Sequence, residues 1–181
     1  MIAPQIILDS RRTEKYDLLM YELSRQGIID YQIWPCLLEK TVVSSINLSH
    51  KMIIRHAKEN KWEQVCVFED DIMFPAADGF EYFISGIPDK FELYLGATYI
   101  LPITNRKIVG FHCYILHESA YDKFLSVPDD VHIDVAMEDI LDWTVCYPFA
   151  ALQRKGFSAN NMKVTDYNWV LSDCDVYGGL P

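Results

Sequence analysis

Three consecutive carboxylates, Glu69, Asp70 and Asp71, are the residues of this chain whose type and spacing most clearly indicate chemistry. They follow an apolar run at residues 65–68 that is typical of a buried strand. In open α/β sheets, ligands bind just outside the carboxyl ends of the strands. Carboxylates that repel one another there favour a divalent cation, and oxygen ligands suit Mg²⁺ or Mn²⁺ together with a diphosphate. A solvated acidic turn is the alternative interpretation.

The three acids cannot all contact one ion equally. Neighbouring side chains on an extended segment point to opposite faces, so Glu69 and Asp71 share a face. We therefore expect Glu69 and Asp71 to hold the metal, with Asp71 in direct contact. Asp70 is expected to contact the nucleoside or to brace the loop.

Three further residues could bind a nucleotide or its metal. Arg11 and Arg12 follow the first expected strand, and a guanidinium is a forked donor that suits phosphate. Their alternative is a solvated helix face. His112 could ligate the metal or bond a substrate hydroxyl through a neutral ring nitrogen, or it could be a buried histidine that is hydrogen-bonded within the sheet.

Alternating strands and helices must position these residues. Strands are expected at residues 5–8, 31–34, 65–68, 91–96 and 109–116, and helices at residues 11–26, 44–60, 118–125 and 134–144. Strands that alternate with helices predict an α/β sandwich with a largely parallel sheet. A single domain spanning residues 1–181 is expected, with an irregular C-terminal arm at about residues 160–181.

Composition narrows the classes of partner. The 181 residues carry a net charge of −10, which argues against nucleic acid or an anionic membrane as the main partner. The five cysteines are widely spaced without a Cys-x-x-Cys pair, so reduced thiols are expected. The N-terminus lacks the pattern of a signal peptide, and no stretch approaches the length of a transmembrane segment. A cytoplasmic protein is the expectation.

Seven short motifs occur along the chain, and their order indicates a family resemblance. They are Leu8-Asp9-Ser10-Arg11-Arg12, Leu48-Ser49-His50, Phe68-Glu69-Asp70-Asp71, Leu93-Tyr94-Leu95-Gly96, Gly110-Phe111-His112-Cys113-Tyr114-Ile115-Leu116, Asp134, and Pro148 with Gln153 and Ser158. Together they resemble glycosyltransferase family 25, the lipooligosaccharide and collagen galactosyltransferase-like group. The matches cover about residues 6–158.

The resemblance implies a GT-A-type, Rossmann-like α/β/α sandwich. It implies a Mn²⁺- or Mg²⁺-dependent glycosyltransferase that moves a hexose from a nucleotide sugar, such as a UDP-sugar, to a hydroxyl of a glycan or glycolipid, with inversion, as in lipopolysaccharide biosynthesis. Gly96 then falls among the donor-binding residues. Asp134 matches the position of the family's acid, so it is the expected general base. Glu138, one turn further, is the alternative base, and a helix-capping role is the alternative for Asp134.

Two other functions remain open from the sequence. One is a catalytically silent relative that binds a nucleotide or carbohydrate without transferring sugar. The other is a metal-dependent phosphohydrolase that uses the same acids. The second is disfavoured because the sequence contains neither a second clear metal-ligand motif nor a P-loop.

Overall fold

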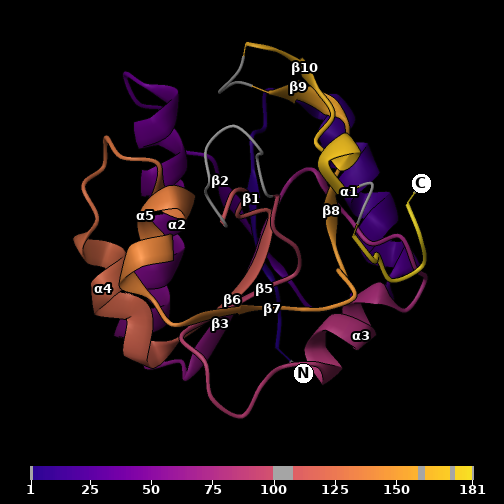
Figure 1. Cartoon of the computed structure of the whole chain (residues 1–181). Helices are drawn as coiled ribbons and strands as arrows, with labels where there is room; N and C mark the ends of the chain where they lie inside the picture. The colour runs from indigo at the N-terminus through magenta and orange to yellow at the C-terminus, as the bar shows by residue number, and fades with distance from the viewer. Residues whose placement is uncertain (1, 100–107, 159–161, 172–173, 181) are drawn as a thin grey trace.

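The computed structural model describes residues 2–99, 108–158, 162–171 and 174–180. Its centre is a six-stranded sheet in the order β2-β1-β3-β6-β5-β7 (Figure 1). The strands are β1 (Gln5–Leu8), β2 (Gln32–Pro35), β3 (Gln64–Glu69), β5 (Leu93–Leu95), β6 (Cys113–His117) and β7 (Trp143–Val145). β6 runs antiparallel to both its neighbours, while the other five strands share one direction. The expected mostly parallel α/β sheet is confirmed.

Helices cover both faces of this sheet. The α-helices are α1 (Thr13–Arg25), α2 (Val42–Glu59), α3 (Gly79–Ser85), α4 (Tyr121–Ser126) and α5 (Ile133–Ile140), and two short 3₁₀ helices lie at Glu118–Ala120 and Asn168–Leu171. α2, α4 and α5 lie on one side of the sheet, and α1 and α3 on the other (Figure 1). The molecule is therefore an α/β/α sandwich.

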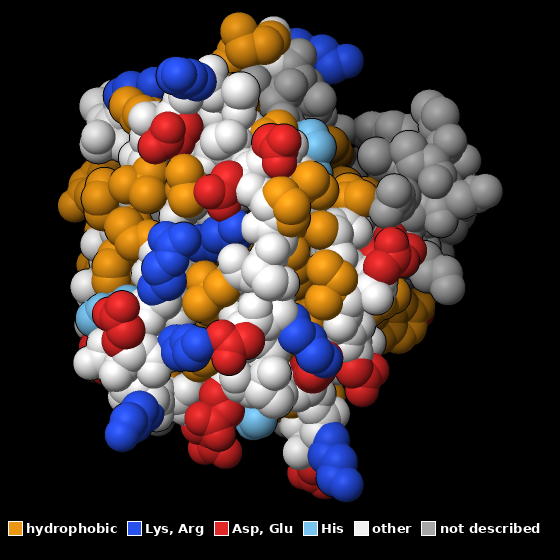
Figure 2. All heavy atoms as spheres, turned by 90° about the vertical axis from the view of Figure 1, so that its left-hand side faces the viewer, with side chains coloured by type: hydrophobic (Ala, Val, Ile, Leu, Met, Phe, Trp, Pro, Cys, Tyr) orange, Lys and Arg blue, Asp and Glu red, His pale blue; other side chains and the backbone are white. Residues whose placement is uncertain are grey.

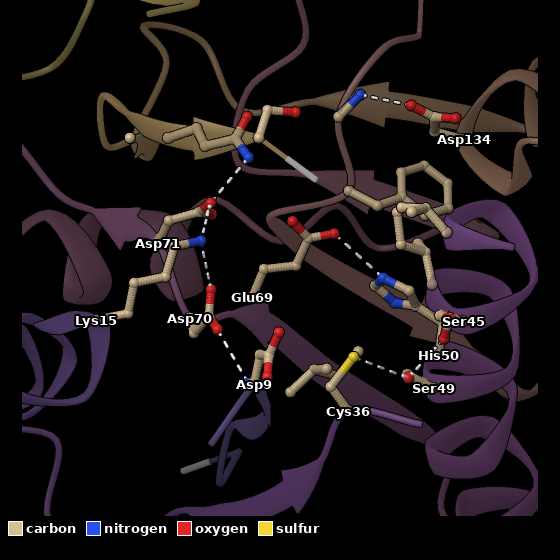
Figure 3. A pocket seen from close by; sticks show the side chains of 18 of the residues that line it. Asp9, Lys15, Cys36, Ser45, Ser49, His50, Glu69, Asp70, Asp71 and Asp134 are labelled. Atoms are coloured by element: carbon tan, nitrogen blue, oxygen red, sulfur yellow. Dashed lines mark hydrogen bonds and ion pairs between the residues drawn. The ribbon is translucent and has the colours of Figure 1, made fainter. Parts of the chain in front are cut away.

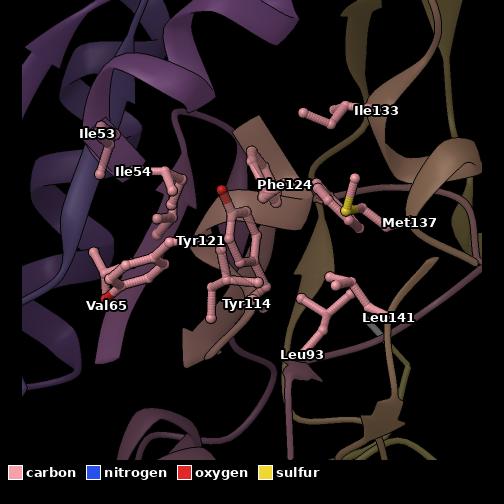
Figure 4. Close-up of a cluster of buried hydrophobic side chains, with 14 of the residues drawn as sticks. Ile53, Ile54, Val65, Leu93, Tyr114, Tyr121, Phe124, Ile133, Met137 and Leu141 are labelled. Atoms are coloured by element: carbon pink, nitrogen blue, oxygen red, sulfur yellow. The ribbon is translucent and has the colours of Figure 1, made fainter. Parts of the chain in front are cut away.

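Strand β3 shows how the sequence builds both cores. Its side chains alternate between faces, so Val65 and Val67 belong to one buried cluster while Cys66 and Phe68 belong to the other. On the first face, α2, α4 and α5 contribute a shared cluster (Figure 4) that includes Ile53, Ile54, Tyr114, Phe124 and Met137. A strand that is buried on both sides needs a near-continuous apolar run, which is the pattern that residues 65–68 have.

The outer surface over α2, α4 and α5 is mixed in charge. Acidic and basic side chains lie interspersed on this face (Figure 2). Two exposed ion pairs, Lys58–Asp122 and Lys123–Glu92, belong to it. Within the part of the chain that the structure describes, no helix is long and apolar enough to span a membrane.

Two small sheets bring the C-terminal third of the chain to the acidic triplet. β4 (Ile72–Met73) pairs with β8 (Leu152–Gln153), and β9 (Gly156–Ser158) pairs with β10 (Lys163–Thr165). The register sets Gln153 opposite Ile72, the residue that follows Asp71. In the C-terminal arm, Tyr177 stacks on Tyr82 of α3 with ring centroids 3.9 Å apart.

Two elements differ from the sequence-based expectation. The helix expected at residues 134–144 ends at Ile140, and the aromatic and β-branched residues 143–145 instead form β7 beside β5. The strand expected at residues 109–116 begins only at Cys113, so His112 precedes β6 rather than lying within it.

The inward face of helix α1 includes polar residues as well as apolar ones. Tyr16 is 45% exposed, whereas Lys15 and Glu22 are buried beside Leu19 and Leu23. Polar residues therefore take part of the inward face, and one of them reaches the acidic triplet.

Candidate active site

A cavity of about 250 Å³ lies at the edge of the sheet where β1, β2 and β3 end. The residues just after β1 and β3, Asp9 and the acidic triplet, line it together with Lys15 of α1 and His50 of α2. Figure 3 shows these side chains converging from their separate elements. This is the position at which open α/β sheets bind ligands, as the sequence predicted.

Asp70 and Asp71 share one buried lysine. The Nζ atom of Lys15 lies 2.8 Å from Asp70 Oδ1 and 2.9 Å from Asp71 Oδ2. The second oxygen of Asp70 accepts a hydrogen bond from the backbone N–H of Asp9 at 3.0 Å. Asp70 thus ties the end of β1 to the end of β3.

Asp71 has one saturated oxygen and one unsatisfied oxygen. Its Oδ2 accepts hydrogen bonds from Lys15 and from Nε2 of Gln153, the latter at 3.1 Å. Its Oδ1 is buried and has no hydrogen-bond partner among the described residues. A buried carboxylate oxygen left unpaired costs free energy, so its environment favours a positively charged ligand.

Glu69 belongs to a chain of hydrogen bonds that reaches into the core. His50 Nε2 lies 3.2 Å from Glu69 Oε1, and His50 Nδ1 lies 2.9 Å from the hydroxyl of Tyr114. Because a carboxylate can only accept, Nε2 donates to Glu69 and Nδ1 accepts from Tyr114. Burial raises the pKa of Glu69, but the hydrogen bond that His50 donates, together with the positive charge of nearby Lys15, outweighs burial and lowers that pKa overall. His50 therefore orients the carboxylate of Glu69.

His112 is fully buried beside the same acids. Its Nε2 lies 3.3 Å from the carbonyl oxygen of Ala151, so Nε2 carries the proton and Nδ1 presents a lone pair. Nδ1 has no hydrogen-bond partner in the described part of the chain. Burial lowers the pKa of His112, which keeps the ring neutral and able to ligate a metal.

Arg11 and Arg12 line the cavity and clamp Asp9. Arg11 donates from Nε and Nη2 to the two oxygens of Asp9 at 2.8 and 2.7 Å, and Arg12 Nε lies 3.4 Å from Asp9 Oδ2. The side-chain hydrogen bond from Arg11 is the main reason why the pKa of Asp9 is lowered. Two guanidinium groups against one carboxylate leave a positive charge at this end of the cavity.

Asp134 lies on the opposite wall of the cavity. Its Oδ2 accepts a hydrogen bond from the backbone N–H of Gly110 at 2.9 Å, and its Oδ1 accepts one from the N–H of Val135 at 2.8 Å. These bonds hold the carboxylate toward the cavity at the start of α5 (Figure 3). Each carboxylate oxygen keeps a second acceptor site, so Asp134 can still take up a proton.

Three predicted site residues do not line this cavity: Glu138, Gly96 and the buried His112. Glu138 is half-buried one turn along α5 and does not line the cavity. Gly96 lies at the end of β5, where an added Cβ would come within 2.8 Å of Cys113 Sγ and 3.0 Å of Ala151 Cβ. The glycine at this position is therefore explained by close packing.

The donor atoms present suit Mg²⁺ or Mn²⁺ bound together with a diphosphate. Within the described ranges, Asp71 Oδ1 and His112 Nδ1 are buried acceptors without hydrogen-bond partners, and Asp71 and Glu69 line the cavity. The described residues contain no group of three His, Cys, Asp or Glu side chains already placed to hold an ion. A site of this type needs no such group, because Mg²⁺ is usually held by one or two carboxylates plus substrate phosphates.

Sequence reasoning missed Lys15. A lysine in an amphipathic helix is normally read as solvent-exposed, yet Lys15 is only 8% exposed. Burial alone would lower the pKa of Lys15, but the carboxylates of Asp71 and Asp70 raise it overall, so the ammonium stays charged. The signal in the sequence was the spacing of Lys15, Leu19 and Glu22 on one helix face.

The fold and the position of this cavity define the chain as a GT-A-type α/β protein. A glycosyltransferase involved in glycosylation of the major capsid of PBCV-1 matches with a TM-score of 0.54 and 13% identity, over 88% of this chain and 96% of that chain. A mutant of Drosophila β-1,4-galactosyltransferase 7, crystallised with manganese, UDP-Gal and xylobiose, matches with a TM-score of 0.55 and 11% identity, over 98% of this chain and 76% of that chain.

Sequence comparison adds no narrower assignment. No protein-family model matches the chain, and a search of curated proteins finds no relative. At these identities the structural matches show the fold alone. Membership of glycosyltransferase family 25 therefore stays a prediction that rests on the motifs.

Proposed function

We propose that this protein is a metal-dependent glycosyltransferase that transfers a hexose from a UDP-sugar to a hydroxyl of a glycan or glycolipid, with inversion. The observation that carries the proposal is the buried Oδ1 of Asp71, which lies in the candidate cavity of a GT-A-type fold and has no hydrogen-bond partner among the described residues. Nδ1 of buried His112 is likewise unpaired in that part of the chain. One structural neighbour was crystallised with manganese and UDP-Gal, which supports a nucleotide-sugar donor for this chain too.

The residues of the chain divide the work between two ends of the cavity. Asp71 and His112 would hold Mn²⁺ or Mg²⁺, and Glu69, oriented by His50, would complete or support that site. When bound, the cation neutralises charge on the leaving diphosphate as the glycosidic bond breaks. Arg11 and Arg12 supply guanidinium donors for the phosphates.

Asp134 acts on the acceptor. Inverting transfer requires a carboxylate that takes the proton of the acceptor hydroxyl as this oxygen attacks the sugar carbon. Asp134 faces the cavity and is held by the N–H of Gly110, so its position is fixed before substrate arrives. Preorganised groups contribute to the transition state without a cost of reorganisation.

A panel of nucleotide sugars tests this proposal. Thermal unfolding of the protein is measured with each donor, with Mn²⁺ or with EDTA, because ligand binding raises apparent stability. The proposal expects one class of UDP-sugar to raise Tm only when Mn²⁺ is present. Release of UDP from that donor in the presence of glycan acceptors then tests catalysis.

A silent nucleotide-binding relative is the second candidate. The ion pairs of Lys15 with Asp70 and Asp71 favour it, because they already compensate part of the charge that a metal would meet. Both candidates predict nucleotide binding, but only the transferase releases UDP from the donor. Donor binding without transfer or donor hydrolysis would select the second candidate.

A further inference from the structure

The ammonium group of Lys15 contacts the carboxylate of Asp71, which is the residue that the proposed function assigns as a metal ligand. It reaches Asp71 and Asp70 from α1 at 2.9 and 2.8 Å, and its side chain is 10% exposed. Neither contact is a surface ion pair, because the carboxylates are also largely buried. An ammonium so placed opposes the approach of a second cation.

The charges of the cluster show what this lysine changes. Glu69, Asp70 and Asp71 carry three negative charges, and Lys15 carries one positive charge. The cluster therefore keeps two negative charges, which one divalent ion would neutralise. If Lys15 were absent, the cluster would attract a divalent cation more strongly even without a nucleotide.

The same ammonium has the opposite effect on an anionic ligand. Lys15 lines the cavity together with Arg11 and Arg12, so a diphosphate that enters meets positive charge as well as the acids. A metal that arrives with a diphosphate brings its own negative oxygen ligands, which offset the repulsion by the ammonium.

We propose that Lys15 is a built-in counter-cation that weakens the binding of free Mn²⁺ or Mg²⁺ and so makes metal binding depend on the diphosphate of the nucleotide. This inference rests on the proposed function and assigns a regulatory residue within the same site. Because coupling between two ligands is reciprocal, the nucleotide strengthens metal binding by the factor by which the metal strengthens nucleotide binding.

Binding of Mn²⁺ tests this role without any activity measurement. Free Mn²⁺ is titrated by electron paramagnetic resonance in the wild type and in Lys15→Met, each with and without UDP. The charge-free variant is expected to bind Mn²⁺ alone more tightly, by roughly 5–150-fold, the usual range for coupled sites. UDP should then strengthen Mn²⁺ binding less in the variant than in the wild type.

Two variants serve as controls. Lys15→Arg keeps the charge and should bind Mn²⁺ alone as weakly as the wild type. Lys51→Met removes another buried lysine, which contacts the Val127 carbonyl and Asp129 and does not line the cavity, so it should leave Mn²⁺ binding unchanged. Circular dichroism checks the fold, and Lys15→Gln replaces Lys15→Met if the methionine variant does not fold.

The outcomes separate this inference from the proposed function. If the charge-free variants bind Mn²⁺ alone with wild-type affinity while UDP still strengthens Mn²⁺ binding, the role of Lys15 is overturned and the proposed function stands. If UDP does not strengthen Mn²⁺ binding in the wild type or in any of the variants, the metal-dependent function itself is overturned.

Discussion

The hydroxyl of Tyr114 lies 2.9 Å from Nδ1 of His50, and this contact joins the buried core to the carboxylate of Glu69. Tyr114 lies in β6 and packs in the cluster that α2 and α4 cover, whereas Glu69 faces the cavity. The orientation of an acid in the site therefore depends on the hydroxyl of a buried residue that does not line the cavity.

Tyr114→Phe tests this connection. The substitution leaves Nδ1 of buried His50 without its donor, so the free energy of unfolding should fall by about 1–3 kcal/mol in urea denaturation. Tyr121→Phe is the matched control, because it removes a hydrogen bond to the Trp62 carbonyl far from Glu69. Mn²⁺-dependent UDP binding should weaken in Tyr114→Phe only. If the two variants bind UDP equally well in Mn²⁺, the Tyr114 hydroxyl does not affect the site.

Asp71→Asn tests the assignment of the metal ligand. The amide keeps the shape of the side chain and an acceptor for Gln153, so the fold should survive. Loss of the charge should reduce the rate of sugar transfer by roughly 10²–10³-fold or more, the usual effect of removing one group that stabilises transition-state charge. Asp122→Asn, at an exposed ion pair, should transfer at the wild-type rate. Near-normal turnover by a folded Asp71→Asn protein would favour the alternative interpretation, in which Glu69, Asp70 and Asp71 form an acidic turn without a catalytic role.

Asp134→Asn tests the general base. Proton removal belongs to the transition state, so kcat should fall by roughly 10²–10⁴-fold while metal and nucleotide affinity stay nearly intact. If Asp134 only holds the N–H of Gly110, asparagine keeps an acceptor for that bond and the rate should hardly change. A wild-type rate would move the base elsewhere, with Glu138 as the next residue to test.

The pH dependence of stability should differ in sign between Asp9 and Asp70. Arg11 lowers the pKa of Asp9 below its ordinary 3.8, so its stabilising contribution is present above that pH and is lost as the pH falls through the folded-state pKa. Burial raises the pKa of Asp70, so its contribution is present below pH 3.8 and is lost as the pH rises through the folded-state pKa.

Urea denaturation in EDTA measures this difference. The free-energy gap between the wild type and Asp9→Asn should be about 1 kcal/mol or less near neutral pH, because Arg11 is exposed, and should narrow below pH 3.8. The wild type should gain stability relative to Asp70→Asn as the pH falls. If the free-energy gap between the wild type and each variant changed with pH in the same direction for both variants, these pKa directions would be contradicted.

Much of the fold was predictable because local pattern and tertiary structure agree. The apolar runs at residues 5–8 and 65–68 form β1 and β3, and the helical spacing before Gly27 and Asn60 marks α1 and α2. The helix expected to continue through Thr144 was wrong, since pairing of residues 143–145 with β5 outweighed local helical spacing.

Local pattern predicted the part of the cavity that lies at strand ends, and the motif resemblance added Asp134 at the start of α5. The acids after β3 follow from the local pattern, but this pattern does not reveal that β6 runs antiparallel and brings His112 to the same edge. Nor does it reveal Lys15, because a lysine becomes buried only when carboxylates from a distant strand compensate its charge.

Calorimetric titration of the wild-type protein with UDP, in Mn²⁺ and in EDTA, tests the central claim most directly. Because the carboxylates of the cavity repel a diphosphate unless a cation lies between them, the account predicts that Mn²⁺ strengthens UDP binding, by roughly the 5–150-fold typical of coupled ligands or more. UDP binding of equal affinity in Mn²⁺ and in EDTA would contradict the account.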